Sequence, residues 1–451
     1  MRTGMHSAAV CARRLACGLL VVALAAQAAL AGEYERTENT APESAQDTAL
    51  GLDELRDEAE LPALKLLQDA LERASDFWAD SRLSLNVRAF DFDRENGLGP
   101  YEQVFEAGAE LGFESGRLDD RWSFGASWHA SSAVRDRIED KQPGAPEPAD
   151  ISVLSRAWLQ FHFSEDWHVS LYRQDFNLPY LNRLDIRMIP NTHEGYVVKH
   201  LGEDFEFVAG HIAKFKRRDS DRFVPMGEAA GVPGNTAGTG IVGARGNVTP
   251  SVNVGGIVLH TQDLFTTVYG ELSYKQALDE DWAVQFAAQG TRQFSHGDER
   301  LGDFDTNSWG ARLALGFRGT VLTLARTGTG RGADIQRPFG GTPGFTSSMI
   351  FDFDRAGEQA RRIGLSQNLT DYNLPALSFI ATYTDGRGAI AADGTPLPDS
   401  REIAFTADYQ PQKGPLKGLW LRVRWADADR GDPAADRRDL RIILNYRLEV
   451  L

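Results

Sequence analysis

The amino-acid sequence predicts an all-β fold: a transmembrane antiparallel β-barrel of eighteen strands, with inward-folded loops and a short N-terminal helix. From Ser81 onward, apolar residues recur at every second position in segments of eight to fourteen residues. That period is typical of strands with two different faces. The connections alternate between short and long along the chain. Beyond residue 31 no run of 18 apolar residues occurs, which excludes helical membrane spans.

The first 31 residues have the pattern of a secretory signal peptide. Three arginines precede an apolar run at 15–30, and a small–x–small cleavage sequence occupies 29–31. A short membrane anchor is the alternative, but the run is short and ends in the cleavage pattern. Both cysteines, Cys11 and Cys17, lie within this segment. The remaining chain therefore has no disulfide, and its stability must come from a large architecture.

The charge balance argues against a nucleic-acid partner. The chain has 48 basic and 64 acidic residues, a net charge of −16. Removing the three arginines of the signal segment leaves 45 basic against 64 acidic residues, or −19. Only 42% of the residues are hydrophobic, as in a soluble protein. A barrel with lipid outside and water inside has the same average, because apolar and polar residues alternate.

Residues 32–80 differ from the rest and are expected to form an acidic periplasmic segment. Residues 33–60 are acidic and poor in aromatics, which predicts disorder. Within 61–78, apolar residues at helical spacing predict an amphipathic helix. That helix could contact the barrel mouth or the cell wall, but we favour simple packing on the barrel rim.

Residues 81–451 are predicted to form the barrel. An even strand number places both ends of the barrel on the periplasmic side. Closure is required, because unpaired backbone groups are costly in lipid. The eighteen strands are expected near 82–92, 101–114, 121–131, 151–163, 166–175, 195–201, 204–215, 239–248, 251–261, 265–277, 281–294, 307–318, 320–328, 360–370, 375–385, 401–410, 418–427 and 439–450.

The connections support this strand count. Those expected at the periplasmic end include the short turns at 164–165, 202–203, 278–280 and 318–320. The long connections fall in the alternate slots, at 132–150, 176–194, 216–238, 329–359, 386–400 and 428–438. A barrel of sixteen to eighteen strands leaves an aqueous lumen. The connection 176–194 is too apolar for a solvated loop, so we expect it to fold into that lumen.

Strand parity assigns side chains to faces. On 151–163 it directs Val153, Ala157 and Leu159 to lipid and Arg156, Trp158 and His162 inward. Applied to other strands, it predicts a lumenal ladder of seven arginines: Arg156, Arg312, Arg362, Arg422, Arg424, Arg441 and Arg447. The loops expected to narrow the lumen carry Arg183, Asp185, Arg187, Glu194, Asp352, Asp354 and Glu358.

The ladder has two interpretations. Arginine stays charged and holds a carboxylate bidentately, so a series of weak sites lets an anion enter and leave. Alternatively, each arginine pairs with a wall or loop carboxylate and braces the barrel. We favour a selectivity role for the set as a whole. His162 and His193 are expected to be a polar wall residue and a loop brace.

Motifs for other chemistry are absent from the sequence. It has no Walker loop, no HExxH, no GxSxG and no cysteine cluster. We therefore expect no catalytic residues, no metal and no cofactor. A barrel enzyme, or a structural barrel whose lumen is closed, is the alternative class.

Several segments resemble the OprD family of outer-membrane porins. They are DSRLSL at 80–85, FDFDR at 90–94, RQD at 173–175, DIRMIPNTHEG at 185–195, KRRDS at 216–220, PGFTS at 343–347, DFDRAGE at 352–358 and GLWLRVR at 418–424. His193 stands where the family more often has an aromatic residue, and the segment 33–80 is longer than the family pattern. The resemblance implies an eighteen-strand barrel narrowed by inward loops, in which lumenal arginines guide carboxylate-bearing solutes such as amino acids, aromatic acids or short peptides.

These observations together predict a passive outer-membrane channel for small hydrophilic solutes, without enzymatic activity. Its expected partners are the solutes, the lipid and lipopolysaccharide of the outer membrane, and the barrel-assembly machinery. That machinery often reads a terminal aromatic, whereas this chain ends in Leu451. Monomer and homotrimer both remain open.

Overall fold

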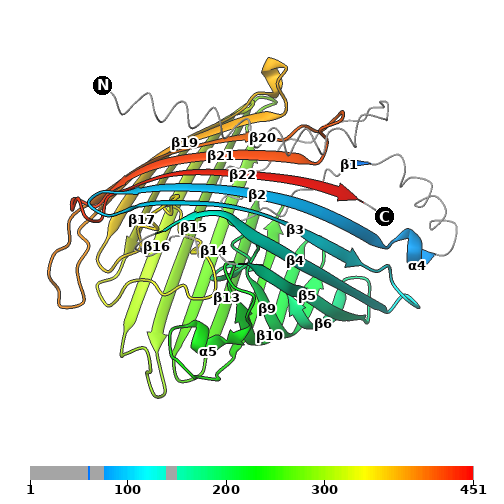
Figure 1. The fold of residues 1–451 in the computed structure, drawn as a ribbon. Coiled ribbons are helices and arrows are strands. Elements are labelled where there is room, and N and C mark those ends of the chain that lie inside the picture. The colour runs from blue at the N-terminus through cyan, green and yellow to red at the C-terminus, as the bar shows by residue number, and fades with distance from the viewer. Residues whose placement is uncertain (1–58, 61–75, 139–149, 450–451) are drawn as a thin grey trace.

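A computed structural model describes residues 59–60, 76–138 and 150–449, and its main feature is one closed antiparallel β-barrel (Figure 1). The eighteen barrel strands are β2 (Arg82–Asn96), β3 (Tyr101–Glu114), β4 (Trp122–Arg137), β5 (Ile151–His162), β6 (Trp167–Gln174), β9 (Thr192–Leu201), β10 (Phe205–Lys216), β12 (Thr239–Thr249), β13 (Val252–Thr261), β14 (Phe265–Ala277), β15 (Trp282–Ser295), β16 (Asp305–Phe317), β17 (Thr320–Thr329), β18 (Gln359–Asn368), β19 (Leu377–Arg387), β20 (Ser400–Tyr409), β21 (Leu419–Asp429) and β22 (Arg437–Glu449).

Each strand pairs with its neighbours in sequence, and the first and last strands close the ring. β2 pairs with β22 from Ser84↔Glu449 to Asn96↔Arg437. No sheet edge is left to lipid along that seam, as the cost of unpaired backbone groups requires. All eighteen predicted strands are therefore confirmed. The largest difference is at β4, which runs to Arg137 because Gln103 of β3 still pairs with it there.

The predicted N-terminal features fall mostly outside the described residues. The signal segment 1–31 lies there entirely, and so does the predicted helix 61–78 up to residue 75. Asp76–Ala79 forms one helical turn, α4, beside the periplasmic end of β2 (Figure 1). The two-residue strand β1 (Ala59–Glu60) pairs in parallel with the end of β22. Among the described residues, no helix has the length and hydropathy needed to cross a membrane.

Among the described residues, the long connections lie at the end of the barrel opposite the C-terminal end of β22 (Figure 1). The loop 175–191 carries the small hairpin β7 (Asn177–Leu178) and β8 (Leu181–Asn182). The loop 217–238 carries β11 (Val224–Pro225) and α5 (Met226–Ala229). At the other end the connections are shorter, and one contains the 3-10 turn η1 (Thr370–Tyr372). The predicted alternation of long and short connections is confirmed.

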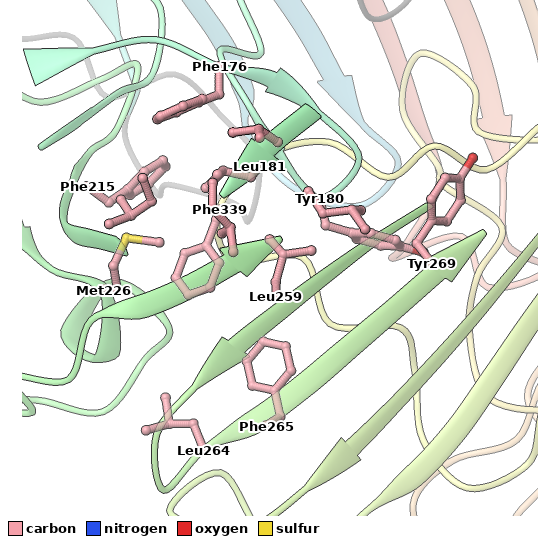
Figure 2. Packing of buried hydrophobic residues seen from close by; sticks show 14 of the residues in the cluster. Phe176, Tyr180, Leu181, Phe215, Met226, Leu259, Leu264, Phe265, Tyr269 and Phe339 are labelled. Atoms are coloured by element: carbon pink, nitrogen blue, oxygen red, sulfur yellow. The ribbon is translucent and has the colours of Figure 1, made fainter. Parts of the chain in front are cut away.

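The largest buried apolar cluster lies inside the barrel (Figure 2). Loop residues Tyr180, Leu181 and Phe339 pack there against wall residues such as Leu259 and Phe265. Leu181 is fully buried. Burial of apolar side chains by these loops is favourable at about 25 cal/mol per Å². The prediction that the apolar loop folds inward is confirmed, and this packing is its cause.

Strand parity holds on most strands but fails on one. Large apolar side chains such as Trp309, Phe286 and Phe405 are exposed on the outer face. On β5, however, Val153 is buried against loop residues Met188 and Ile189, so its predicted position on the lipid face is wrong. The register of β4 with β5 skips Ser155, and such a bulge reverses the faces on one side of it.

Candidate functional site

The candidate site is the part of the lumen that the inward loops narrow. The loop 175–191 is tied to the barrel wall by a buried arginine, Arg88 of β2. Its guanidinium forms a bidentate ion pair with Asp185, donates to the backbone oxygen of Arg187 at 2.6 Å and donates to Asn445 Oδ1 at 2.5 Å. Both charged side chains of the pair are 6% exposed. One wall residue thus fixes the middle of the loop against β2 and β22.

Further polar contacts hold the rest of this loop. Lys216 Nζ of β10 donates to the Pro190 backbone oxygen at 2.9 Å, close to the loop's return to the wall. Farther around the ring, Tyr180 Oη and Thr291 Oγ1 of β15 are 2.8 Å apart. Because β2, which carries Arg88, and β15 lie on opposite sides of the eighteen-strand ring, the loop spans the lumen.

The loop 330–358 is held by a buried carboxylate. Glu402 of β20 is 1% exposed and accepts hydrogen bonds from three successive backbone amides. The distances are 2.7 Å to Met349 N, 3.1 Å to Ile350 N and 2.8 Å to Phe351 N. A carboxylate that receives several N–H donors is a strong anchor. This contact turns the loop toward the lumen.

The two loops also bind each other. The Asn182 side chain donates to the Gly341 backbone oxygen at 3.0 Å and accepts from the Gly341 amide at 2.9 Å. The Asn182 amide donates to the Phe339 oxygen at 3.3 Å. The loops therefore form one connected structure inside the barrel, and a solute must pass beside it.

Three of the predicted ladder arginines pair with carboxylates of the wall. Arg422 binds Asp408 at 2.6 Å and lies 4.6 Å from the Trp420 ring centre. Arg441 binds Asp439 at 2.6 Å. Arg156 of β5 lies 3.3 Å from Glu110 and 3.4 Å from Glu114. All three point to the inner face, as parity predicts, but each has a local negative partner.

Two others contact the loop 330–358. Arg312 of β16 lies 5.0 Å from the centre of the Phe345 ring. Arg362 of β18 donates to the Ser347 backbone oxygen. Arg424 lies directly opposite Arg441 in the sheet register, and among the described residues it has no carboxylate within ion-pair distance. Arg447 lies on the same face of β22 as Arg441, nearer the periplasm.

Cations gather where the loops 175–191 and 217–238 approach β22. Arg187 is buried and lies 3.5 Å from Asp219. Burial lowers the pKa of Arg187 well below its usual value, and the positive charges of Arg218 and Arg441 add to the effect. Burial likewise lowers the pKa of Arg218 to about 10, with a smaller contribution from Arg441. Positive charges that lie this close repel one another, and together they create an attractive potential for an anion.

The predicted loop acids and Arg183 are all engaged in pairs. Arg183 lies 3.4 Å from both Asp175 and Asp185. Arg337 binds Asp352 at 2.9 Å and Asp354 at 2.6 Å. Glu358 is fully buried and binds Arg355 at 2.7 Å.

Glu194 was expected in the loop but belongs to strand β9, which begins at Thr192. Its carboxylate contacts Lys214 at 3.0 Å and Arg173 at 3.4 Å. The strand starts early because Thr192 still pairs with Lys216. Glu194 therefore has its place in the wall, beside the loop.

Burial of the loop acids changes their titration. The ionised form of Asp185 is penalised by burial, yet Arg88 and Arg183 outweigh this and lower the pKa. For Asp354, burial prevails over the attraction of Arg337 and raises the pKa to about 7, with Asp352 adding repulsion. Asp354 can therefore change charge near neutral pH.

Sequence reasoning missed the anchoring residues Arg88, Lys216 and Glu402. All three lie on the inner face, so parity could have placed them in the lumen. Parity does not pair residues far apart in sequence: Arg88 and Asp185 are 97 residues apart. Both histidines are buried: His162 lies 2.8 Å from Ser123 Oγ, and the His193 ring packs between Phe176 and Phe215.

One wall cluster bears on the alternative of a barrel enzyme. His129 Nδ1 lies 2.6 Å from Ser155 Oγ, and His129 Nε2 lies 3.4 Å from Glu110. A serine nucleophile needs such a base, but it must also reach a substrate. Ser155 is fully buried at the β5 bulge, so this cluster serves wall packing.

Comparisons with known proteins match this architecture. The family model described as "outer membrane porin, OprD family" matches residues 169–450. Porin D of Pseudomonas aeruginosa is 25% identical over 427 residues, covering 84% of this chain and 93% of its own. The structure of Pseudomonas aeruginosa OpdK with vanillate has a TM-score of 0.74 at 18% identity, covering 83% of this chain and all 100% of OpdK.

Two further solved structures show the same fold. Pseudomonas aeruginosa OccK9 (OpdG) has a TM-score of 0.75 at 21% identity, covering 83% of this chain and 100% of its own. A BenF-like porin from Pseudomonas fluorescens Pf-5 has a TM-score of 0.74 at 18% identity, covering 82% of this chain and 99% of its own.

Proposed function

The chain belongs to the OprD family of outer-membrane porins, and from that premise we propose that its lumen passes small carboxylate-bearing solutes by passive diffusion. The arginines beside the inward loops attract the anion, and the loops set the size limit. No covalent step and no energy source are involved. The relatives compared above are porins, and a porin needs only a wet path and a graded field.

The observation that carries this proposal is the excess of cations in the narrow zone. Arg424 and Arg441 face each other on neighbouring strands, with Arg422 two residues along. Arg187 and Arg218 interact electrostatically with Arg441 from the loops. Arg422 and Arg441 are partly neutralised by Asp408 and Asp439, whereas Arg424 has no carboxylate at ion-pair distance among the described residues. Arg424 is therefore the residue we expect to meet a solute carboxylate.

Weak attraction suits transport better than tight binding. Arginines that keep a wall carboxylate can share their remaining N–H donors with a passing anion. A solute can then move from one guanidinium to the next without a deep energy minimum. Asp352, which interacts electrostatically with Arg218, adds a negative charge that keeps the attraction for an anion from becoming too strong.

The test is single-channel recording of the refolded protein in a planar bilayer under a salt gradient. We expect a reversal potential with anion preference and block by vanillate, an aromatic carboxylate chosen because OpdK was solved with it. Arg424→Ala should lower the anion preference and weaken vanillate block roughly tenfold, the scale of one charge-assisted contact. Arg424→Lys should keep the preference but lose part of the block, since lysine cannot bind a carboxylate bidentately.

The matched control is Arg318→Ala. Arg318 is exposed in the periplasmic turn after β16 and pairs with Asp281 at 3.0 Å, away from the narrow zone. It removes the same charge, so a general surface effect would appear equally in both variants. Cation preference in the unsubstituted protein would overturn the arginine assignment, and complete absence of conductance would favour a closed barrel.

A further inference from the structure

The outer face of the barrel carries an unusual row of charged residues near its extracellular end. In the sheet register, Arg326 of β17 lies directly opposite Arg361 of β18. Both side chains are exposed, on the face opposite Ala325 and Arg362. Arg362 contacts the inward loop through the Ser347 oxygen, so Arg326 and Arg361 point out of the barrel.

The next row toward the periplasm carries apolar and aromatic side chains on the same strands. Phe286, Leu313, Leu324, Ile363 and Tyr383 follow one another across five strands. The two arginines thus lie at the boundary where the lipid-facing band ends. Trp309 stands on the extracellular side of that boundary, with Arg326 at 5.9 Å from its ring centre. A tryptophan at this level is typical of the aromatic girdle that marks the membrane interface in such barrels.

A groove of about 590 Å³ runs across the same strands. Its lining includes Leu313, Leu324, Ile363 and Tyr383 together with Arg326 and Arg361. The hollow exists because Ala311, the register neighbour of Arg326, is smaller than the side chains around it. The groove is apolar along one row and cationic at its extracellular side, which is the polarity of a lipid with an anionic headgroup.

Neither arginine has a negative partner within the part of the chain that the structure describes. Like charges directly opposite each other in a sheet are destabilising. Asp385 is the register neighbour of Arg361, but its carboxylate binds Arg387 at 3.2 Å. The next arginine in the row, Arg401, already binds Asp429 at 2.6 Å. Among the described residues, neither Arg326 nor Arg361 has a carboxylate at ion-pair distance, so the pair calls for an external anion.

We propose that Arg326 and Arg361 bind a phosphate of lipopolysaccharide, the phosphorylated glycolipid of the outer leaflet, whose acyl chains lie in the apolar part of the groove. Guanidinium groups bind phosphate oxygens bidentately, and two adjacent guanidinium groups match the charge of one phosphate. The site faces away from the lumen, so it is independent of the proposed solute path.

A second copy of the chain is the other occupant to consider. An interface at this row would bring the same two arginines of each copy near each other, unless a carboxylate of the partner met them. The local charge is positive and unbalanced, which favours a small anion over a flat protein surface. We therefore commit to the lipid phosphate and use the oligomeric state as an outcome.

The experiment is native mass spectrometry of the full-length protein in detergent with bisphosphorylated lipid A. The comparisons are the same lipid after removal of its phosphates and phosphatidylethanolamine. We expect lipid A to bind roughly tenfold better than its dephosphorylated form, and Arg326→Ala/Arg361→Ala to remove that preference. Arg326→Lys/Arg361→Lys should keep most of it.

The matched control is Arg292→Ala/Arg438→Ala. These arginines also face outward near the same end, but they pair with Asp305 at 2.7 Å and Asp427 at 2.8 Å. The control removes the same charge and should leave lipid A binding unchanged. Unchanged single-channel conductance of all variants would establish that they fold and would separate this site from the lumenal one.

Three results would overturn the proposal. Equal binding of lipid A with and without phosphates would exclude headgroup recognition. Equal loss of binding in the control variant would reduce the effect to general surface charge. A multimer of the unsubstituted protein in light scattering that becomes monomeric in Arg326→Ala/Arg361→Ala would assign the row to contact between copies.

Discussion

Arg88→Met removes the charge that ties the loop 175–191 to the barrel wall. The pair of Arg88 with Asp185 is almost entirely buried, at 6% exposure on each side. Breaking such a pair by removing one partner costs about 3–5 kcal/mol, because the remaining charge stays buried. Asp185 keeps only its longer contact with Arg183 at 3.4 Å. A cost of about 3 kcal/mol shifts the docked loop toward undocked forms by roughly 150-fold.

Release of the loop should be local. Lys216 still holds Pro190 at 2.9 Å, and the apolar cluster around Leu181 is unchanged. We therefore expect a folded barrel whose loop moves more. In single-channel recordings, Arg88→Met should give larger mean conductance and more current noise than the unsubstituted protein.

Two further variants test the mechanism. Arg94→Met breaks another buried pair from the same strand, with Asp439 at 2.6 Å, but this pair joins wall to wall. It should lower barrel stability without the rise in current noise. Arg88→Met/Asp185→Leu removes both charges and should recover much of the original recording, since an apolar pair avoids the buried charge. Quiet, unchanged recordings for Arg88→Met would refute the reasoning, and so would a double variant noisier than the single one.

Two other predictions concern the loop 330–358. Glu402→Gln should weaken the hydrogen bonds that this side chain accepts from the amides of Met349, Ile350 and Phe351 by about 1–3 kcal/mol in total. Hydrogen exchange of those three amides should therefore accelerate. Glu95→Gln on the outer rim is the control. Exchange no faster than in the control would show that Glu402 is not the anchor. The pKa of Asp354 is raised from an ordinary 3.8 to about 7 in the folded protein, so the folded state binds the proton more tightly than the unfolded state. Protonated Asp354 therefore contributes to stability fully below about pH 4, and this contribution is lost as the pH rises through 7. Ionisation of Asp354 gives the lumen a negative charge, so anion preference should fall between pH 6 and 8 by about the amount that one carboxylate contributes. Asp354→Asn should abolish this pH dependence. A pH dependence that persists in Asp354→Asn would assign it to another group.

Much of the barrel could be read from local patterns. The strands were predictable because the two-residue period needs only near neighbours along the chain. The order of short turns and long loops then set the strand count and the side on which each connection lies. The apolar content of the loop around Leu181 was enough to predict its inward fold, because so many apolar side chains could not remain in water.

The candidate site was only partly predictable. Parity placed Arg422, Arg424 and Arg441 on the inner face, where the structure has them. Parity could not predict that Arg422 pairs with Asp408 while Arg424 has no such partner among the described residues. Such pairing depends on which residues the neighbouring strands place opposite each arginine. Parity failed at Val153, because a bulge adds one residue that leaves no mark in a period-two pattern.

By itself, the sequence determined the closed eighteen-strand barrel, the end of the barrel at which the long connections lie and the inward course of its most apolar loop. These properties follow from alternation, connection length and the cost of an open edge in lipid. The tertiary structure alone decided which charges meet: Arg88 with Asp185, Glu402 with the amides of 349–351, and Arg326 beside Arg361 on the outer face. The reason is that an ion pair depends on distance in space, and barrel closure brings together residues that the chain separates by tens to hundreds of positions.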